Sequence, residues 1–451
     1  MATGGKNLKH IGRFMIVVAV GLLWSAVVSA APDENYNDWL AMTAHQGAVA
    51  PGTVITKRNW QQYQQFMPVG MINMFEGKYF WKMPDDVEIP VGPTIIHPLA
   101  PGFQAATEKY GGQARIVTLP NGHHDIQNYQ SGAPFPNPSG PDKGIEVMAN
   151  RWYEPVPRVL ASLPTNMDNF CGQDRFGSKA CTKTILVYRR LTHNWDPGRP
   201  LNDPRLSNVY YTEWLMVEEP EESKYTADLT VYYEDVKQLE DDFVFVPALR
   251  RSLRLAVSAR CAPLFGSDMT HDDMRGGFNG GISVFDTAFL GQRKILALTE
   301  ANADDGYFPE RYDMPLGFSK PSWGKWGLRL TNVVDVRRIP SMRAGYCYGK
   351  RIMFEDAQFY HELWEDLYDS NMKLWKIVWV VRRAAPVPGQ GISPNNGDVL
   401  ETYYDVQNSH ASYVTSADRT GTDLLFDEQI PSEYRDLSKY STPGGLMQIM
   451  R

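Results

Sequence analysis

Two groups of histidine and aspartate residues are the parts of this chain whose types and spacing could support chemistry. The first is His123-His124-Asp125 with His97 upstream, and these side chains could hold a metal ion or exchange protons as acid and base. Neighbouring residues on a strand point to opposite faces, so His123 and His124 cannot readily share one ion. We therefore predict a solvated or hydrogen-bonded strand end here, with a catalytic or metal site as the alternative.

The second group is His271 with Asp268, Asp272 and Asp273, which could bind Ca²⁺ through carboxylate oxygens. Aspartate also caps helices and closes turns, and we predict this use for Asp268. The chain has no Gly-x-Ser-x-Gly elbow, no Walker loop and no dinucleotide fingerprint. We therefore expect no catalytic residue, no metal and no cofactor.

The first 30 residues have the pattern of a secretory signal peptide. Lys6, Lys9 and Arg13 precede an apolar run from Phe14 to Val28, and small residues follow up to Ala30. This run is shorter than the roughly 20 residues that span a bilayer, so we expect cleavage and no stable membrane anchor. The formal net charge of −7 also argues against nucleic-acid binding, which is driven by neutralising phosphates with cations. We expect a periplasmic protein.

All four cysteines lie beyond this leader, and none forms a Cys-x-x-Cys pair that would indicate zinc or redox chemistry. An even number of cysteines in an exported chain favours disulfides. The short spacing of Cys171 and Cys181 favours that pair and leaves Cys261 with Cys347, while the other two pairings stay open.

The elements that must position these residues change character along the chain. Asn59 to Phe75 has helical spacing, and Pro68 should bend that helix. Met83 to Gly112 is rich in Pro and Gly and indicates a long connection. Later segments alternate with a period of two, and the hairpin strand from Leu374 is apolar on both faces, so each face must be covered. The strand candidates are Thr184 to Arg190, Val209 to Val217, Asp228 to Asp235, Phe243 to Val246, Ser252 to Val257, Lys294 to Leu298, Leu328 to Val336, Cys347 to Phe354, Phe359 to Tyr368, Leu374 to Arg383 and Val399 to Val406.

Aromatic side chains recur on these strands, which would suit a container for an apolar ligand. Such a container needs no catalytic group, because each buried methylene of an acyl chain contributes about 0.8 kcal/mol. Arg250 lies at a Pro-Ala-Leu-Arg-Arg corner, where a guanidinium could hold a head group or form a surface ion pair. The predicted ligand-binding residues are Trp214, Tyr232, Arg250, Trp364, Trp375 and Trp379.

Several short motifs resemble the DUF1329 family, exported proteins of Gram-negative bacteria that are grouped with LolA-like folds. The motifs are Gly132-Ala133-Pro134-Phe135-Pro136, Asn150-Arg151-Trp152-Tyr153, Pro247-Ala248-Leu249-Arg250-Arg251, Gly266-Ser267-Asp268-Met269-Thr270 with Asp272-Asp273, and the hairpin from Trp364 to Trp375. The resemblance implies a mainly β (α+β) fold, in which a large curved antiparallel sheet forms an incomplete LolA/LolB-like barrel with lid helices around a hydrophobic cavity. It implies no catalytic residues.

We therefore predict a periplasmic binding protein or carrier for a hydrophobic small molecule or lipid, such as a sterol-like molecule or a lipoprotein acyl chain. The resemblance adds an RND-type exporter or an outer-membrane protein as the expected partner. The predicted organisation is a signal peptide (1–30), a helical and Pro-rich region wrapping the sheet (31–160) and a LolA-like half-barrel domain (161–451). The alternatives are a periplasmic enzyme acting through His123, His124 and Asp125, and a structural adaptor of a transporter complex.

Overall fold

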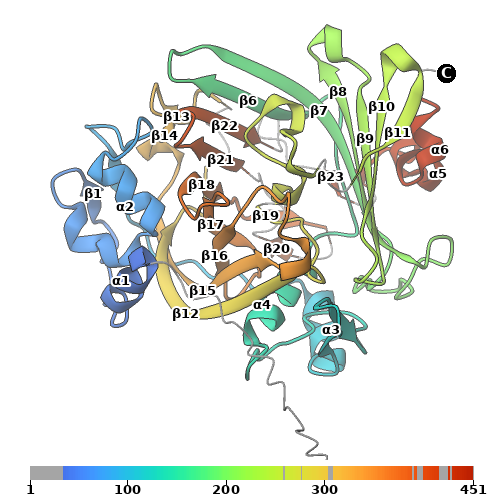
Figure 1. Ribbon diagram of the computed structural model, residues 1–451, viewed down its shortest axis with the longest axis horizontal. Coiled ribbons are helices and arrows are strands. Elements are labelled where there is room, and N and C mark those ends of the chain that lie inside the picture. The colour runs from blue at the N-terminus through green and yellow to red at the C-terminus, as the bar shows by residue number, and fades with distance from the viewer. Residues whose placement is uncertain are drawn as a thin grey trace, which may run out of the picture. The chain divides into compact units, whose positions relative to one another are not determined.

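The structure, a computed structural model, is built around an antiparallel sheet of 15 strands (Figure 1). The structure describes residues 34–256, 260–275, 277–302, 308–388, 391–393, 400–415, 425–426 and 429–449. Pro32–Arg451 forms one compact unit. The predicted signal peptide lies outside the described residues.

The strands of the sheet pair in an order that joins two halves of the sequence. That order is β11 (Arg251–Arg254), β10 (Asp241–Val246), β9 (Ala227–Tyr233), β8 (Val209–Glu219), β7 (Lys179–Arg190), β6 (Asp168–Asp174), β22 (His410–Thr415), β21 (Leu400–Asp405), β18 (Leu374–Val381), β17 (Glu362–Tyr368), β16 (Lys350–Asp356), β15 (Gly327–Arg338) and β12 (Phe285–Ala297), with β5 (Val159–Ser162) and β23 (Leu425–Phe426) off this path. Within the described residues, no pairing between β11 and β12 closes the sheet. The predicted fold class, a large open antiparallel sheet with a few helices, is confirmed.

Short hairpins and helices complete the described structure. Two-stranded pairs form from β1 (Val54–Thr56) with β2 (Glu88–Pro90), β3 (Arg115–Thr118) with β4 (His124–Gln127), β13 (Tyr312–Asp313) with β14 (Phe318–Ser319), and β19 (Ala385–Val387) with β20 (Gly391–Ser393). The α-helices are α1 (Glu34–Met42), α2 (Val69–Glu76), α3 (Pro101–Tyr110), α4 (Lys143–Trp152), α5 (Leu437–Tyr440) and α6 (Pro443–Leu446). No described helix is long and apolar enough to cross a membrane.

One face of the sheet is covered by the N-terminal region. Side chains alternate between the two faces along each strand, and the register places Phe354 opposite Trp364 and Trp364 opposite Trp379. Residues of α1 and α2 and of the segment 308–326 pack on this aromatic layer. Trp39 from α1, for example, meets Phe354 edge-on with ring centroids 5.4 Å apart.

The helix expected from Asn59 to Phe75 is interrupted at Pro68. A 3₁₀ helix, η1 (Trp60–Phe66), ends before the proline, and α2 begins directly after it. The residue before a proline avoids helical backbone angles, and Met67 is accordingly extended with φ −117° and ψ 130°. Pro68 therefore separates two helices, where the sequence predicted one bent helix.

The opposite face is covered by α4 and by residues 260–284, which we call the plug segment. Leu264, Met269 and Met274 of this segment share an apolar cluster with Val378 of β18 and Tyr403 of β21. Phe278 and Ile282 join a second cluster with residues of α4 and β8. The chain itself therefore covers both faces of the sheet, as the two apolar faces of the Leu374 strand predicted.

Both disulfides join the cysteine pairs favoured by the sequence, Cys171 with Cys181 and Cys261 with Cys347. Cys171 and Cys181 lie opposite each other on β6 and β7. Cys261 belongs to the plug segment, and Cys347 lies just before β16. The second disulfide therefore holds the plug segment to the sheet.

Candidate functional site

The residues predicted to bind a ligand lie in separate parts of the structure. Trp364 and Trp379 form a buried pair beneath the N-terminal helices. Trp214 belongs to a different cluster, where its ring meets Tyr440 of α5 edge-on at 4.9 Å. These three tryptophans therefore pack in two separate clusters of the core.

Trp375 and Arg250 are also apart from that pair. The Trp375 indole donates a hydrogen bond to Asp405 Oδ2 at 2.9 Å and packs beside the plug segment. Arg250 is exposed at the corner between β10 and β11, in the left-handed region with φ 50°. The six predicted residues therefore do not line one cavity, and their role in ligand binding stays a prediction.

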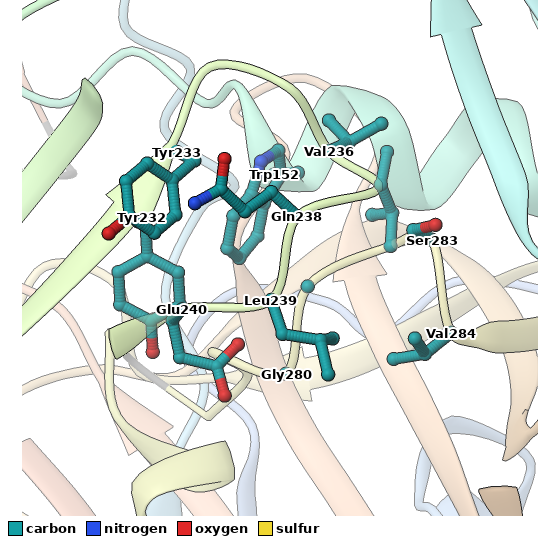
Figure 2. Close-up of a pocket in the computed structure, with 12 residues that line it drawn as sticks. Trp152, Tyr232, Tyr233, Val236, Gln238, Leu239, Glu240, Gly280, Ser283 and Val284 are labelled. Atoms are coloured by element: carbon teal, nitrogen blue, oxygen red, sulfur yellow. The ribbon is translucent and has the colours of Figure 1, made fainter. Parts of the chain in front are cut away.

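Tyr232 lines a small aromatic pocket between β9 and the plug segment (Figure 2). Its ring stacks on Tyr211 with centroids 4.4 Å apart, and its hydroxyl donates to the Asn279 carbonyl at 3.2 Å. The pocket encloses about 20 Å³, which is room for one water molecule. It is too small for an acyl chain. Its walls are Trp152, Tyr232, Tyr233, Val236, Gln238, Leu239, Glu240, Gly280, Gly281, Ile282, Ser283 and Val284.

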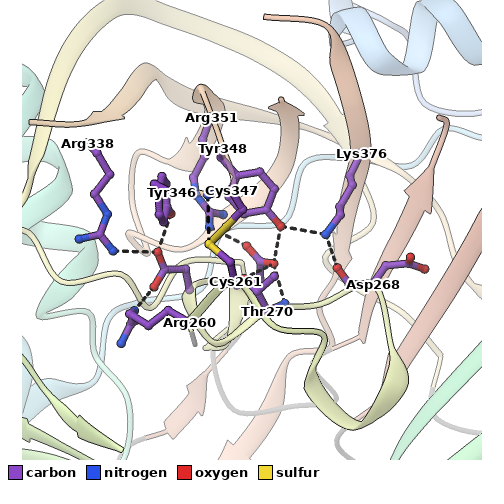
Figure 3. Close-up of a disulfide and its surroundings, with 12 residues drawn as sticks. Arg260, Cys261, Asp268, Thr270, Arg338, Tyr346, Cys347, Tyr348, Arg351 and Lys376 are labelled. Atoms are coloured by element: carbon purple, nitrogen blue, oxygen red, sulfur yellow. Dashed lines mark hydrogen bonds and ion pairs between the residues drawn. A yellow bond between two sulfur atoms is a disulfide. The ribbon is translucent and has the colours of Figure 1, made fainter. Parts of the chain in front are cut away.

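The acidic part of the plug segment is buried against arginines of the sheet. Arg260, Arg338 and Tyr346 all donate hydrogen bonds to the Asp272 carboxylate. Figure 3 labels these three donor side chains. Arg338 Nη2 donates at 3.1 Å and the Tyr346 hydroxyl at 2.5 Å. Burial alone would raise the pKa of Asp272, but the guanidinium groups of Arg260 and Arg338 outweigh it and hold the pKa well below its usual value.

Asp273 and Asp268 have partners of their own. Asp273 accepts hydrogen bonds from Arg351 Nη2 at 2.6 Å and the Tyr348 hydroxyl at 2.8 Å, and it forms a capping box with Thr270. Asp268 Oδ2 lies 2.6 Å from His410 Nδ1. The three aspartates point to three different sets of partners, so they do not form the oxygen cage that Ca²⁺ requires. The aspartate that caps a helical turn is therefore Asp273, whereas the sequence predicted that Asp268 would do so.

The histidines near residue 123 also have separate partners. His97 Nε2 lies 2.9 Å from Glu300 Oε1, whereas His124 Nδ1 lies 3.0 Å from the Thr118 hydroxyl. Asp125 pairs with Lys237 at 2.9 Å. Within the described residues these side chains do not converge on one point. His124 and Asp125 form their contacts at the start of β4, whereas His97 pairs with Glu300 outside that strand.

A groove of about 610 Å³ lies at the β12–β15 side of the sheet, and we call it the edge groove. Its lining residues are Ala48, Val49, Pro51, Gly92, Pro93, Thr94, Ile96, Lys294, Leu328, Arg329, Leu330, Asp356, Ala357 and Gln358. Ile96 is 64% exposed and Leu330 is 45% exposed, so large apolar side chains face solvent here. The volume falls within the range of about 300–1,000 Å³ that is usual for small-molecule sites.

Hydrogen bonds hold the wall of the edge groove that follows β2. The Thr94 hydroxyl donates to the Leu328 carbonyl at 2.9 Å, and Arg329 Nη1 donates to the Ile95 carbonyl at 2.8 Å. Arg329 also forms a two-pronged ion pair with Asp356, at 2.7 and 3.1 Å. The backbone of residues 94–95 is thus fixed to β15, and the groove is a built feature.

The cationic groups of the edge groove differ in their pairing. The Arg329 guanidinium is buried and neutralised by Asp356. Lys294 lies opposite Leu330 in the β12–β15 register, is exposed, and forms no ion pair with a described carboxylate. The groove therefore combines apolar walls with one ammonium group that is able to meet an anionic group.

Sequence reasoning missed the edge groove because its wall comes from a stretch that was assigned to a long connection. The signal that could have indicated it is the pair Ile95-Ile96, two large apolar residues between prolines in a segment without periodicity. Such residues have no sheet face or helix stripe to join. Exposed apolar patches of this kind mark interaction sites.

The fold and the groove define an open antiparallel sheet protein with a side groove and no recognised catalytic centre within its described residues. The family described as proteins of unknown function, DUF1329, matches residues 54–446, and the chain belongs to this family, as the motifs predicted. A DUF1329 family protein from Desulfovibrio piger is similar in structure, with 13% identity, a TM-score of 0.44, and coverage of 67% of this chain and 100% of that chain. A LolA superfamily protein from Nitrosomonas europaea is 11% identical with a TM-score of 0.36, covering 62% of this chain and 90% of that chain. No curated protein matches the chain.

Proposed function

We propose that this protein is a periplasmic carrier of a hydrophobic ligand, and that the ligand binds in the edge groove. The observation that carries the proposal is the groove itself, which has a volume of about 610 Å³ and exposes Ile96 and Leu330 on its apolar walls. Each methylene buried there would contribute about 0.8 kcal/mol. A chain of ten methylenes would then gain about 8 kcal/mol before the costs of association are subtracted.

The charged side chains of the edge groove favour one class of hydrophobic ligand. Beside the apolar wall, Lys294 supplies an ammonium that donates to the Gly47 carbonyl at 3.5 Å and forms no ion pair with a described carboxylate, whereas the Arg329 guanidinium is already neutralised. An amphiphile with one anionic head group, such as a fatty acid or an acidic lipid, would satisfy both features. Its chain would lie along Leu328 and Leu330, and its head group would meet Lys294.

Two features of the chain support a periplasmic location. The described cysteines are all in disulfides, which persist in oxidising compartments. The N-terminal apolar run has the pattern of a secretory signal. As part of the same proposal, an RND-type exporter or an outer-membrane protein would be the partner that gives or receives the ligand.

The test is binding of the fluorescent fatty acid cis-parinaric acid to the delipidated full chain. We expect saturable uptake by the wild type and a loss of at least tenfold in affinity in Leu330→Asp and Ile96→Asp, because a carboxylate would have to be desolvated by the acyl chain. Both side chains are largely exposed, so folding should survive. Phe176→Asp is the matched control, since Phe176 is 81% exposed on the β6–β7 turn and does not line the groove.

The roles of head group and chain can be separated with one more variant. Lys294→Gln should weaken binding of the fatty acid and leave binding of its methyl ester unchanged, because the ester has no charge to pair with the ammonium. Absence of wild-type uptake would reject the carrier proposal. Uptake that is equal in Leu330→Asp, Ile96→Asp and Phe176→Asp would place the ligand elsewhere.

A further inference from the structure

We propose that Asp228, Asp242 and His271 form a binding site for a divalent transition-metal ion. One ligand atom from each residue lies within 4.8 Å of the other two. His271 Nε2 is 3.5 Å from Asp242 Oδ2 and 3.8 Å from Asp228 Oδ2. Among the residues that the structure describes, these three make up the one group of His, Cys, Asp and Glu side chains positioned in this way.

The sheet and the plug segment bring the three residues together. Asp228 is on β9 and Asp242 on β10, and the register pairs Asp242 with Thr230. The two aspartates are thus diagonal neighbours on one face of the sheet. His271 comes from η6 (His271–Asp273) in the plug segment, so the site joins this segment to two strands of the sheet.

The two carboxylates lack the cationic partners that other buried acids of this protein have. Asp228 is 4% exposed and Asp242 is 8% exposed, and neither forms an ion pair with a described lysine or arginine. Asp242 Oδ1 is buried and has no hydrogen-bond partner in the described part of the chain. Asp272, one residue after His271, is by contrast held by Arg260 and Arg338. A pair of adjacent buried carboxylates needs a proton or a cation between them.

The hydrogen bonding around the two carboxylates also fits a metal site. Thr230 donates to Asp228 Oδ1 at 3.3 Å and orients that carboxylate.

The donor set indicates the kind of ion. Two carboxylate oxygens and one imidazole nitrogen suit Zn²⁺, Mn²⁺ or Fe²⁺, and two positive charges neutralise the two carboxylates. Metal–ligand bonds of about 2.0–2.2 Å place tetrahedral ligands about 3.3–3.6 Å apart, close to the two separations from His271. Three protein ligands leave a fourth position for water. The bound ion would fasten η6 to β9 and β10, in addition to the Cys261–Cys347 disulfide that holds the same segment.

The test is metal binding by the untagged full chain after treatment with EDTA and dialysis. We expect the wild type to bind one equivalent of Zn²⁺ in calorimetry and to show a four- or five-coordinate Co²⁺ absorption spectrum. Zn²⁺ should also raise the thermal midpoint. His271→Gln and Asp242→Asn should each weaken Zn²⁺ binding at least tenfold and abolish this thermal shift, with circular dichroism in EDTA as the check on folding.

His410→Gln is the matched control, because His410 also contacts a plug-segment carboxylate, Asp268, at 2.6 Å, but has no second carboxylate of the kind that completes the site. It should bind Zn²⁺ as the wild type does. Wild-type protein without stoichiometric uptake, or with only the weak spectrum of octahedral Co²⁺, would overturn the proposal whatever the variants do. Unchanged affinity in His271→Gln and Asp242→Asn, or an equal loss in His410→Gln, would also overturn it. None of these results depends on a ligand in the edge groove.

Discussion

Replacing Asp272 by asparagine removes the negative charge that two buried guanidinium groups share. Arg260 Nε and Arg338 Nη2 both donate to this carboxylate. Asp272 is fully buried and each arginine is 4% exposed, so water cannot take the place of the lost charge. Arg260 keeps its ion pair with Glu240, whereas Arg338 keeps no described carboxylate partner. The variant therefore leaves one buried cation without a counter-charge.

Removing one partner of a buried ion pair costs about 3–5 kcal/mol. We expect Asp272→Asn to lower the free energy of unfolding by this amount at neutral pH, measured by urea denaturation with tryptophan fluorescence. Asp203→Asn is the control, because it breaks a pair with Arg205, whose side chain is 64% exposed. Exposed pairs contribute less than about 1 kcal/mol.

The stabilisation by Asp272 should also depend on pH and should be lost in acid. The folded-state pKa of Asp272 is held below its unfolded value of about 3.9, so its contribution is complete above about pH 4 and is lost as pH falls through the folded pKa. The difference between wild type and Asp272→Asn should therefore shrink in acid. Hydrogen exchange should also show faster exchange in the plug segment of the variant. A loss under about 1 kcal/mol, equal to that of Asp203→Asn, would refute the role of Asp272 as an anchor of this segment.

Asp168 should show the opposite dependence on pH. Burial raises the pKa of Asp168 to about 8, so its contribution to stability falls as pH rises from about 4 to about 8. Asp168→Asn should flatten this slope in thermal melts across that range, and a variant with the wild-type slope would contradict the assignment. The disulfides should differ by loop length, since the cysteines are 10 and 86 positions apart. Replacing Cys171 and Cys181 by serine should lower the free energy of unfolding by about 3 kcal/mol, against about 4–5 kcal/mol for Cys261 and Cys347. Equal losses in guanidinium unfolding would show that loop length does not set the stabilisation by each disulfide.

Strands with a clear alternation of apolar side chains could be predicted from the sequence. The strand from Leu374 alternates two sets of apolar side chains, and the structure places it as β18 with both faces buried. The hairpin from Phe359 also forms, although β17 begins only at Glu362. Trp364 and Trp379 were correctly assigned to paired strands. Their cluster could not be predicted, because it depends on which distant segment covers the face.

Segments whose pairing is decided by distant partners could not be predicted. β6 has the sequence DNFCGQD, which has no apolar alternation, and β22 is a short run of six residues. β12 extends from Phe285, although the sequence indicated a strand only from Lys294. Its first half contains Gly291 at a register shift and is a strand only because β15 pairs with it. The approach of His271 to Asp228 and Asp242 could not be predicted for the same reason, since both aspartates come from strands earlier in the chain.

The pairing of β6 with β22 has a consequence for how this molecule is made. Strands β5 to β11 come from the first part of the sequence, whereas β12, β15 to β18, β21 and β22 come from the later part. The two groups meet at this seam, and β23 adds a second pairing with β5. During synthesis the edge of β6 has no partner until residues 410–415 have emerged, and an unpaired edge invites pairing with other chains. Contacts between such distant residues also form slowly. A truncation before residue 410 would therefore leave an open strand edge in the middle of the sheet, and we expect it to aggregate.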